Sequence, residues 1–140
     1  MSVALGFDYG RARVGVAVGN ALTGTARALP ALRCPRDEGG WRALGRVVAD
    51  WHPDVLVVGR PGGPDTPEAL LEAIGAFAAE LEQRFARPVR WVDESLTSRS
   101  AASTLRDARA SGAKNWRVRP GEEDSLAAAE IVDQYLRDGG

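Results

Sequence analysis

The chain has 140 residues, of which 44% are hydrophobic and 26% charged, and its 18 basic and 19 acidic residues give a net charge of −1 with histidine neutral. This composition is that of a folded globular protein, and the length predicts one domain over residues 1–140, which excludes the disordered and fibrous classes. Cys34 is the only cysteine and His52 the only histidine. A disulfide framework, a thiolate metal cluster and chemistry that needs two histidines are therefore excluded.

The hydrophobic pattern predicts an α/β fold. Three short apolar segments come first and predict an antiparallel meander of strands over residues 3–8, 14–19 and 25–32. Pro30 predicts that the third strand lies near an edge of the sheet. Helices and strands then alternate, over 37–51 (helix), 54–59 (strand), 67–85 (helix), 88–92 (strand), 97–110 (helix) and 124–136 (helix). The result is a five-stranded mixed sheet with an antiparallel N-terminal meander, flanked by helices.

No segment of the sequence predicts export or membrane insertion. The N-terminal residues include Asp8 and lack a basic start followed by an apolar core, so no signal peptide is expected. The apolar runs are far shorter than the roughly 18 residues that a membrane-spanning helix needs. We expect a cytoplasmic protein that makes no membrane contact.

Asp8 is the first acidic residue at a position where a charge is costly. Alternation along the first strand places it on the face of Ala4 and Gly6, opposite Leu5 and Phe7. If that strand is central, an ionised carboxylate there must be paired or bound to a cation. The alternative is an aspartate that only caps the tight turn following the strand.

Two further acidic sites follow later elements. Asp93 and Glu94 come directly after the fifth strand, where ligands gather in α/β sheets, and the sequence pattern alone does not choose between them. Asp124 lies on the stripe of the last helix that also carries Ala128 and Ile131, which predicts that it faces the sheet, whereas Glu130 is predicted to face solvent. The alternatives are a solvated acidic loop for the first site and a helix N-cap for the second.

One carboxylate from each of these three places would meet at one edge of the sheet. Three ionised carboxylates at close range repel one another unless a divalent cation compensates. Oxygen ligands without histidine or cysteine indicate Mg²⁺ or Mn²⁺ rather than zinc. The chemistry that such a site favours is phosphoryl transfer or phosphodiester hydrolysis.

The chain resembles the YqgF/RuvX family of RNase H-like nucleases in order and spacing over nearly its whole length. The matching segments are Phe7-Asp8-Tyr9-Gly10 with Arg13, Gly15-Val16-Ala17-Val18-Gly19, Val57-Val58-Gly59, Asp93-Glu94-Ser95-Leu96-Thr97-Ser98 and Asp124-Ser125-Leu126-Ala127-Ala128. The chain departs from the family pattern at Ser95, where an arginine is usual, and in the loop of residues 60–66.

The resemblance implies a single RNase H-like domain and a metal-dependent nuclease whose carboxylates are Asp8, Glu94 and Asp124, which settles the choice at the fifth strand. Members of that family are described as candidate Holliday junction resolvases and as nucleases that trim the 5′ end of precursor 16S ribosomal RNA. The expected partner is thus structured RNA or branched DNA. Symmetric resolution of a four-way junction would require two active sites and hence a homodimer.

Basic residues cluster near the expected site. Residues 84–119 contain nine basic and three acidic side chains, which predicts attraction of a phosphate backbone, the alternative being a solvated arginine-rich helix face. The candidate nucleic-acid-binding residues are Arg13, Arg99, Arg106, Arg109, Lys114, Arg117 and Arg119. Two other functions remain open on the residues alone, an actin-like ATP-binding phosphotransferase domain and a non-catalytic RNA-binding adaptor of the same fold.

Overall fold

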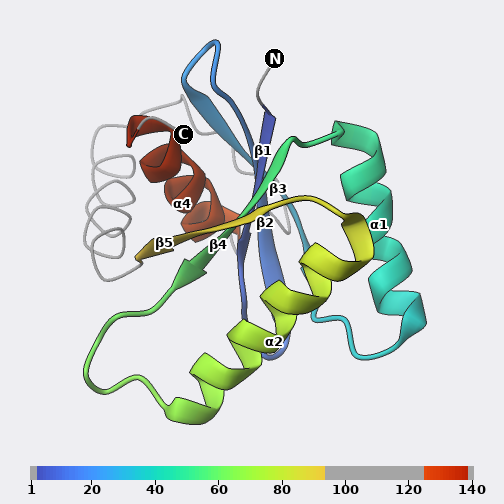
Figure 1. Cartoon of the computed structure of the whole chain (residues 1–140), viewed down its shortest axis with the longest axis vertical. Coiled ribbons are helices and arrows are strands. Elements are labelled where there is room, and N and C mark those ends of the chain that lie inside the picture. Colours follow the sequence, from blue (N-terminus) through green and yellow to red (C-terminus); the bar gives the residue numbers. More distant parts are fainter. Residues whose placement is uncertain (1–2, 94–124, 139–140) are drawn as a thin grey trace.

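The computed structural model describes residues 3–93 and 125–138, and Figure 1 shows their arrangement. The elements are β1 (Val3–Asp8), β2 (Arg13–Asn20), β3 (Thr25–Arg33), α1 (Glu38–Trp51), β4 (Val55–Arg60), α2 (Glu68–Phe85), β5 (Val89–Asp93) and α4 (Leu126–Arg137). The predicted helix over 97–110 and the predicted irregular segment after it lie outside the described residues. Every other predicted element is confirmed, with ends that differ by one or two residues.

The five strands form one mixed sheet in the order β3-β2-β1-β4-β5, so β1 is central. The first three strands are antiparallel neighbours, and β1, β4 and β5 run parallel. The predicted topology is therefore confirmed, as is the edge position of the strand that contains Pro30. Proline has no amide hydrogen to donate to a further strand, so an edge suits it.

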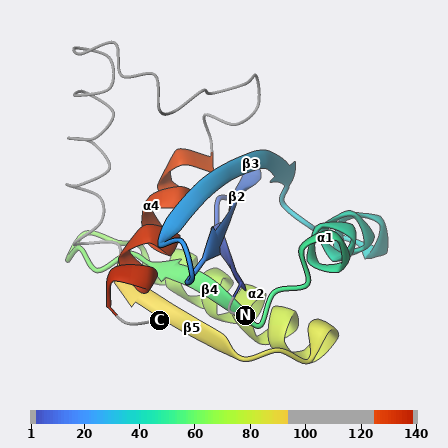
Figure 2. The same ribbon diagram turned by 90° about the horizontal axis from the view of Figure 1, so that it is seen from above.

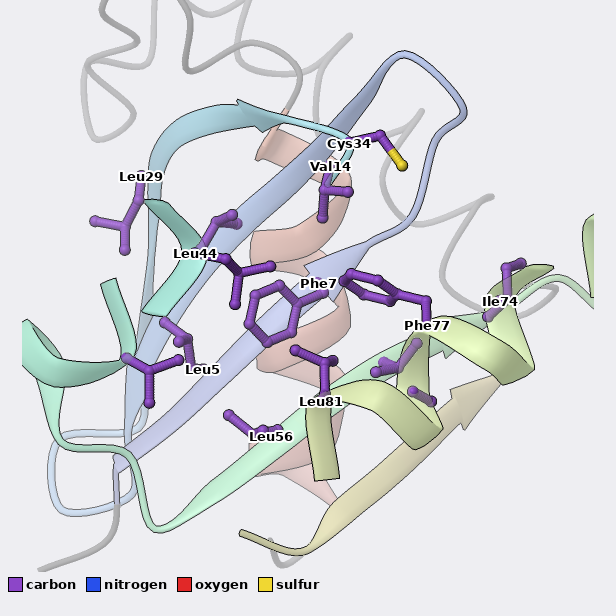
Figure 3. Close-up of a cluster of buried hydrophobic side chains, with 14 of the residues drawn as sticks. Leu5, Phe7, Val14, Leu29, Cys34, Leu44, Leu56, Ile74, Phe77 and Leu81 are labelled. Carbon is purple, nitrogen blue, oxygen red and sulfur yellow. The ribbon is translucent and has the colours of Figure 1, made fainter. Parts of the chain in front are cut away.

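Helices cover both faces of the sheet, as Figures 1 and 2 show: α1 and α2 lie on one face and α4 lies on the other. The core under α1 and α2 is made of large side chains, among them Leu5, Phe7, Leu44 and Leu81, which point toward one another in Figure 3. Phe7 meets Phe77 edge to face, with ring centroids 5.9 Å apart. Such aromatic pairs prefer this geometry over a face-to-face sandwich.

The face under α4 is lined by small side chains. Ala4 and Ala17 belong to the second core cluster, which also contains Ala128 and Val132 of α4. A Cβ atom added at Gly6 would overlap the side chain of Val132. Because glycine has no side chain and that of alanine is small, α4 lies close against β1 and β2.

Helix α1 has a local reason for where it begins and ends. Asp37 caps α1, with its Oδ1 accepting a hydrogen bond from the amide of Gly40 at 3.0 Å. His52 ends that helix in the left-handed conformation at φ 47°, and its amide donates to the carbonyl of Val48. His52 therefore has a role in helix termination, and among the described residues no group of three or more acidic, histidine or cysteine side chains forms a metal site.

One prediction about α4 is wrong. Glu130 was expected to face solvent, but it is 6% exposed. Its Oε1 accepts a hydrogen bond from Nη2 of Arg137 at 3.3 Å, so an exposed arginine two turns along the helix partly compensates the buried charge. Burial, followed by the negative charge of Asp133, raises the pKa of Glu130 above its usual range.

No helix within the described part of the chain is long and apolar enough to cross a membrane.

Candidate active site

The sheet brings several charged side chains to one edge. Because β1, β4 and β5 are parallel, their last residues Asp8, Arg60 and Asp93 lie on the same side, and the register pairs Arg60 with Asp93. The antiparallel meander adds the first residue of β2 and the last of β3, Arg13 and Arg33, which pair with each other. Ligands of α/β sheets collect at such an edge.

Asp8 ends the central strand and is half-buried. Its strand alternates as predicted: Ala4 and Gly6 face α4, whereas Leu5 and Phe7 face α1 and α2. Asp8 shares the parity of the first pair and therefore belongs to the α4 side. Its cross-strand partner is Gly15, which has no side chain.

The beginning of α4 is tied directly to the strand next to Asp8. Ser125 is fully buried, and its Oγ accepts a hydrogen bond from the backbone amide of Val16 at 2.9 Å. The β2–β3 ladder shifts register between Val14 and Val16, and a bulge of this kind leaves a strand amide in need of another partner. Ser125 supplies that partner and fixes the helix start one residue away from Gly15, the partner of Asp8.

Sequence reasoning did not identify Ser125 as a site residue. Its contact crosses 109 positions of the chain, so no local pattern predicts the bond. The available signal was its place in the chain: a small polar residue directly after Asp124 and three before Ala128, on the side of the helix that packs on the sheet. A hydroxyl at that place needs a buried partner.

The predicted site residues divide into two groups. Asp8 and Arg13 lie within the described structure, at the same edge of the sheet. Glu94 and Asp124 lie outside the described residues, as do the basic residues Arg99, Arg106, Arg109, Lys114, Arg117 and Arg119. Glu94 is joined to Asp93, the last residue of β5, and Asp124 is joined to the anchored Ser125.

The structure bears on Asp93, the other acid considered at the fifth strand. Val92 is buried in the cluster under α4, whereas Val89 packs against the cluster under α1 and α2. Strand alternation gives Asp93 the parity of Val89. Alternation therefore assigns Asp93 to the opposite side of the sheet from Asp8, although Asp93, on the edge strand β5, also lines a pocket with Gln134 and Tyr135 of α4.

Tyr9 follows Asp8 but has a packing role. Its ring lies 5.1 Å from that of Phe77, and burial, together with a hydrogen bond to the Cys34 side chain, raises the pKa of its hydroxyl. Cys34 is itself buried, at the end of β3, with the core residues of Figure 3. Cys34 is part of the core under α1 and α2, and Tyr9 packs against that core.

The comparison with protein families matches residues 2–138 to the model described as RuvX, Holliday junction resolvase. Proteins from Burkholderia ambifaria and Burkholderia multivorans are 44% and 43% identical over 133 residues, which are 94% of this chain and 87% of each relative. Both carry names that describe a candidate pre-16S rRNA nuclease.

Solved structures with the same fold include RuvC of Thermus thermophilus in complex with a Holliday junction substrate. It has a TM-score of 0.59 and 22% identity, covering 99% of this chain and 97% of that chain. The Holliday junction resolvase of fowlpox virus has a TM-score of 0.56 and 12% identity, covering 97% of this chain and 99% of that chain. These similarities confirm the predicted RNase H-like fold.

Proposed function

Since the chain belongs to the RuvX family of Holliday junction resolvases, we propose that it is a divalent-metal-dependent endonuclease that hydrolyses phosphodiester bonds in structured nucleic acid. The observation that carries the proposal is the position of Asp8, a half-buried acid at the end of the central strand, on the side of α4. The names of the relatives favour precursor 16S ribosomal RNA as the substrate, and the family description favours branched DNA. Either role would be carried out by a single domain in the cytoplasm.

The surroundings of Asp8 fit a hard divalent cation. Gly6 and Gly15 border it without side chains, and the other expected ligands, Glu94 and Asp124, are also carboxylates. Such a donor set suits Mg²⁺ or Mn²⁺. When bound, an ion of this kind supplies charge stabilisation and a more acidic water molecule for attack on phosphorus.

The three acids would have different tasks. Asp8 would anchor the ion, because β1 is hydrogen-bonded to a strand on each side and holds its end rigidly. Glu94 would act from the end of β5, and the parity of Asp93 supports this assignment over its neighbour. Asp124 would complete the ligand set or orient the attacking water from the start of α4, which the Ser125 bond holds close to Asp8.

The basic residues would position the substrate without reading bases. Arg13 is exposed at the start of β2, five residues after Asp8. Contacts from arginine and lysine to phosphates fix the register of a nucleic acid and carry no sequence information. We assign the same task to the six basic residues of the segment from residue 99 to residue 119. Action on both strands of a four-way junction would require a homodimer.

The test is the Asp8→Asn variant, assayed with Mg²⁺ and with Mn²⁺ on junction DNA, single-stranded RNA and a ribosomal RNA precursor. The substitution keeps the shape of the side chain and removes its charge, so cleavage should fall by roughly 10²-fold or more, as when a preorganised charged group is lost from a reacting centre. Asp50→Asn is the matched control, because Asp50 is exposed on α1, on the other face of the sheet. Its activity should equal that of the wild type.

The result that contradicts the proposal is metal-dependent cleavage by Asp8→Asn at the wild-type rate. Binding of all three substrates by the wild type without cleavage of any would instead favour the non-catalytic adaptor. Thermal unfolding of both variants shows whether a loss of activity reflects a loss of folded protein.

A further inference from the structure

A group of arginines lies at the end of the sheet that carries Asp8, on the side of strands β2 and β3. Arg11 is in the β1–β2 turn, Arg33 ends β3 and Arg36 lies between β3 and α1, and all three are exposed. Figure 1 shows that the turn and the segment entering α1 lie at the same side of the sheet. We call Arg11, Arg33 and Arg36 the meander arginines.

Backbone contacts hold the two segments together. The amide of Cys34 donates to the carbonyl of Ala12 at 3.0 Å, and Nη2 of Arg36 donates to the carbonyl of Arg11 at 2.8 Å. The sheet register places Arg33 opposite Arg13. The arginines therefore come from distant parts of the sequence but are fixed next to one another.

The acids that border the meander arginines are partly engaged elsewhere. Residues 8–13 and 32–38 contain four arginines and three acids: Asp8, Asp37 and Glu38. The Oδ1 of Asp37 accepts a hydrogen bond from the amide of Gly40, and Glu38 forms an ion pair with Arg84 at 2.6 Å. The positive charges of Arg36 and Arg11 both act to lower the pKa of Tyr9, against the larger effects that raise it, so both charges are close to that side chain. Two of the three acids therefore have other partners, and the meander arginines present positive charge beside Asp8.

The meander arginines lie within reach of a nucleic-acid strand that is bound at Asp8. Arg11 is three residues after Asp8, which limits the separation of their Cα atoms to about 10 Å. Arg33 is two strand spacings across the sheet from β1 and two residues beyond the level of Asp8, which places it about 12 Å from Asp8. At about 3.4 Å of helix axis per nucleotide in one strand, such distances correspond to roughly three nucleotides from the cleaved bond.

We propose that the meander arginines bind the phosphate backbone of the nucleic-acid substrate on the β3 side of the cleaved bond, about three nucleotides away. The inference rests on the proposed nuclease function, because it takes Asp8 as the point of cleavage. It adds to the basic residues predicted from the sequence a second contact surface, on the other side of Asp8 in the sheet from β4 and β5. The contact is with phosphates and is independent of base identity.

The experiment measures binding of the wild type and an Arg11→Ala/Arg33→Ala variant to a labelled junction DNA and to an RNA hairpin, in chelator so that no cleavage occurs. Arg36 is left unchanged because its side chain also donates a hydrogen bond to the backbone carbonyl of Arg11, and its loss could disturb the fold. Affinity should fall by about tenfold for each phosphate contact that is lost. The slope of log K against log salt should become less steep by about 0.7–0.9 for each contact.

Arg27→Ala is the matched control. Arg27 is an exposed arginine of the same strand, β3, but it pairs with Val18, about 20 Å from Arg33 at the opposite end. Its removal changes the net charge without touching the surface, so it should leave affinity and salt slope nearly unchanged. The Arg11→Lys/Arg33→Lys variant keeps the charges and should retain most of the salt slope.

Two results would overturn the proposal: wild-type affinity in the Arg11→Ala/Arg33→Ala variant, or an equal loss in the Arg27→Ala control for each charge removed. Cleavage by the wild type is measured in parallel with metal present. If the wild type cleaves no substrate but the arginine variant still binds more weakly, the nuclease proposal fails and the contact surface remains. If cleavage is normal and binding does not depend on the arginines, only this inference fails.

Discussion

The bond between Ser125 and β2 provides a quantitative test of how the active edge is held. Ser125→Ala removes the acceptor of the Val16 amide at a site that is fully buried, where water does not replace it. Leaving a buried donor unsatisfied costs about 1–3 kcal/mol. For a chain of this length, each kcal/mol lowers Tm by about 3–5 °C, so a decrease of roughly 3–15 °C is expected.

Asn20→Ala is the matched control for that measurement. Asn20 also accepts a hydrogen bond from a backbone amide, that of Leu22, at 2.8 Å, but in an exposed turn where water can take over. Its loss should cost no more than about 0.5 kcal/mol. Denaturant unfolding of both variants against the wild type measures the difference. Equal stabilities of Ser125→Ala and the wild type would refute the reasoning, because they would mean that another group satisfies the Val16 amide.

Two further variants test the packing and charge of α4. Gly6→Ala places a Cβ atom against Val132 and should reduce the free energy of unfolding by about 1–3 kcal/mol, with recovery in the Gly6→Ala/Val132→Ala double variant; a single variant as stable as the wild type would contradict the close approach of α4. Glu130→Gln should raise Tm at pH 7, because folding raises the pKa of this carboxyl and its ionised form is therefore destabilising above that pKa. The gain should vanish as the pH falls to the pKa of the unfolded chain, about 4.3. Melting curves measured over a series of pH values test this. A Glu130→Gln variant that is less stable at pH 7 would show that the Arg137 pair outweighs burial.

The sequence predicted the strands and their faces well because strand alternation is a local property. The contrast between Leu5 and Phe7 on one face and Ala4 and Gly6 on the other is evident in the sequence of the strand itself, and the structure confirms it. The position of Asp8 on the α4 side follows from the same alternation. Pro30 likewise marks an edge strand by its own chemistry.

Features that depend on distant contacts were not predictable in this way. Glu130 was predicted to face solvent because it lies off the stripe of Asp124, Ala128 and Ile131. It is buried all the same, and its Oε1 accepts a hydrogen bond from Arg137, two helical turns along. The bond from Ser125 needs β2 beneath the helix. The meander arginines form no charged run in the sequence, because Arg11 and Arg33 are 22 positions apart. Only the pairing of β2 with β3 brings their segments together.

The unequal faces of the sheet explain how one helix can serve the active edge. On the α4 side, β1 and β2 present Gly6 and Gly19, and an added Cβ at either glycine would overlap a methyl group of Val132. Larger residues there would push α4 away from the sheet and take Ser125 out of reach of Val16, since N–H···O hydrogen bonds have donor–acceptor distances of about 2.7–3.2 Å. The side that packs under α1 and α2 carries no such restriction, and it is built from leucine, valine and phenylalanine. The small residues of β1 and β2 therefore set the distance between Asp8 and the start of α4, and with it the geometry in which we expect the acids to act together.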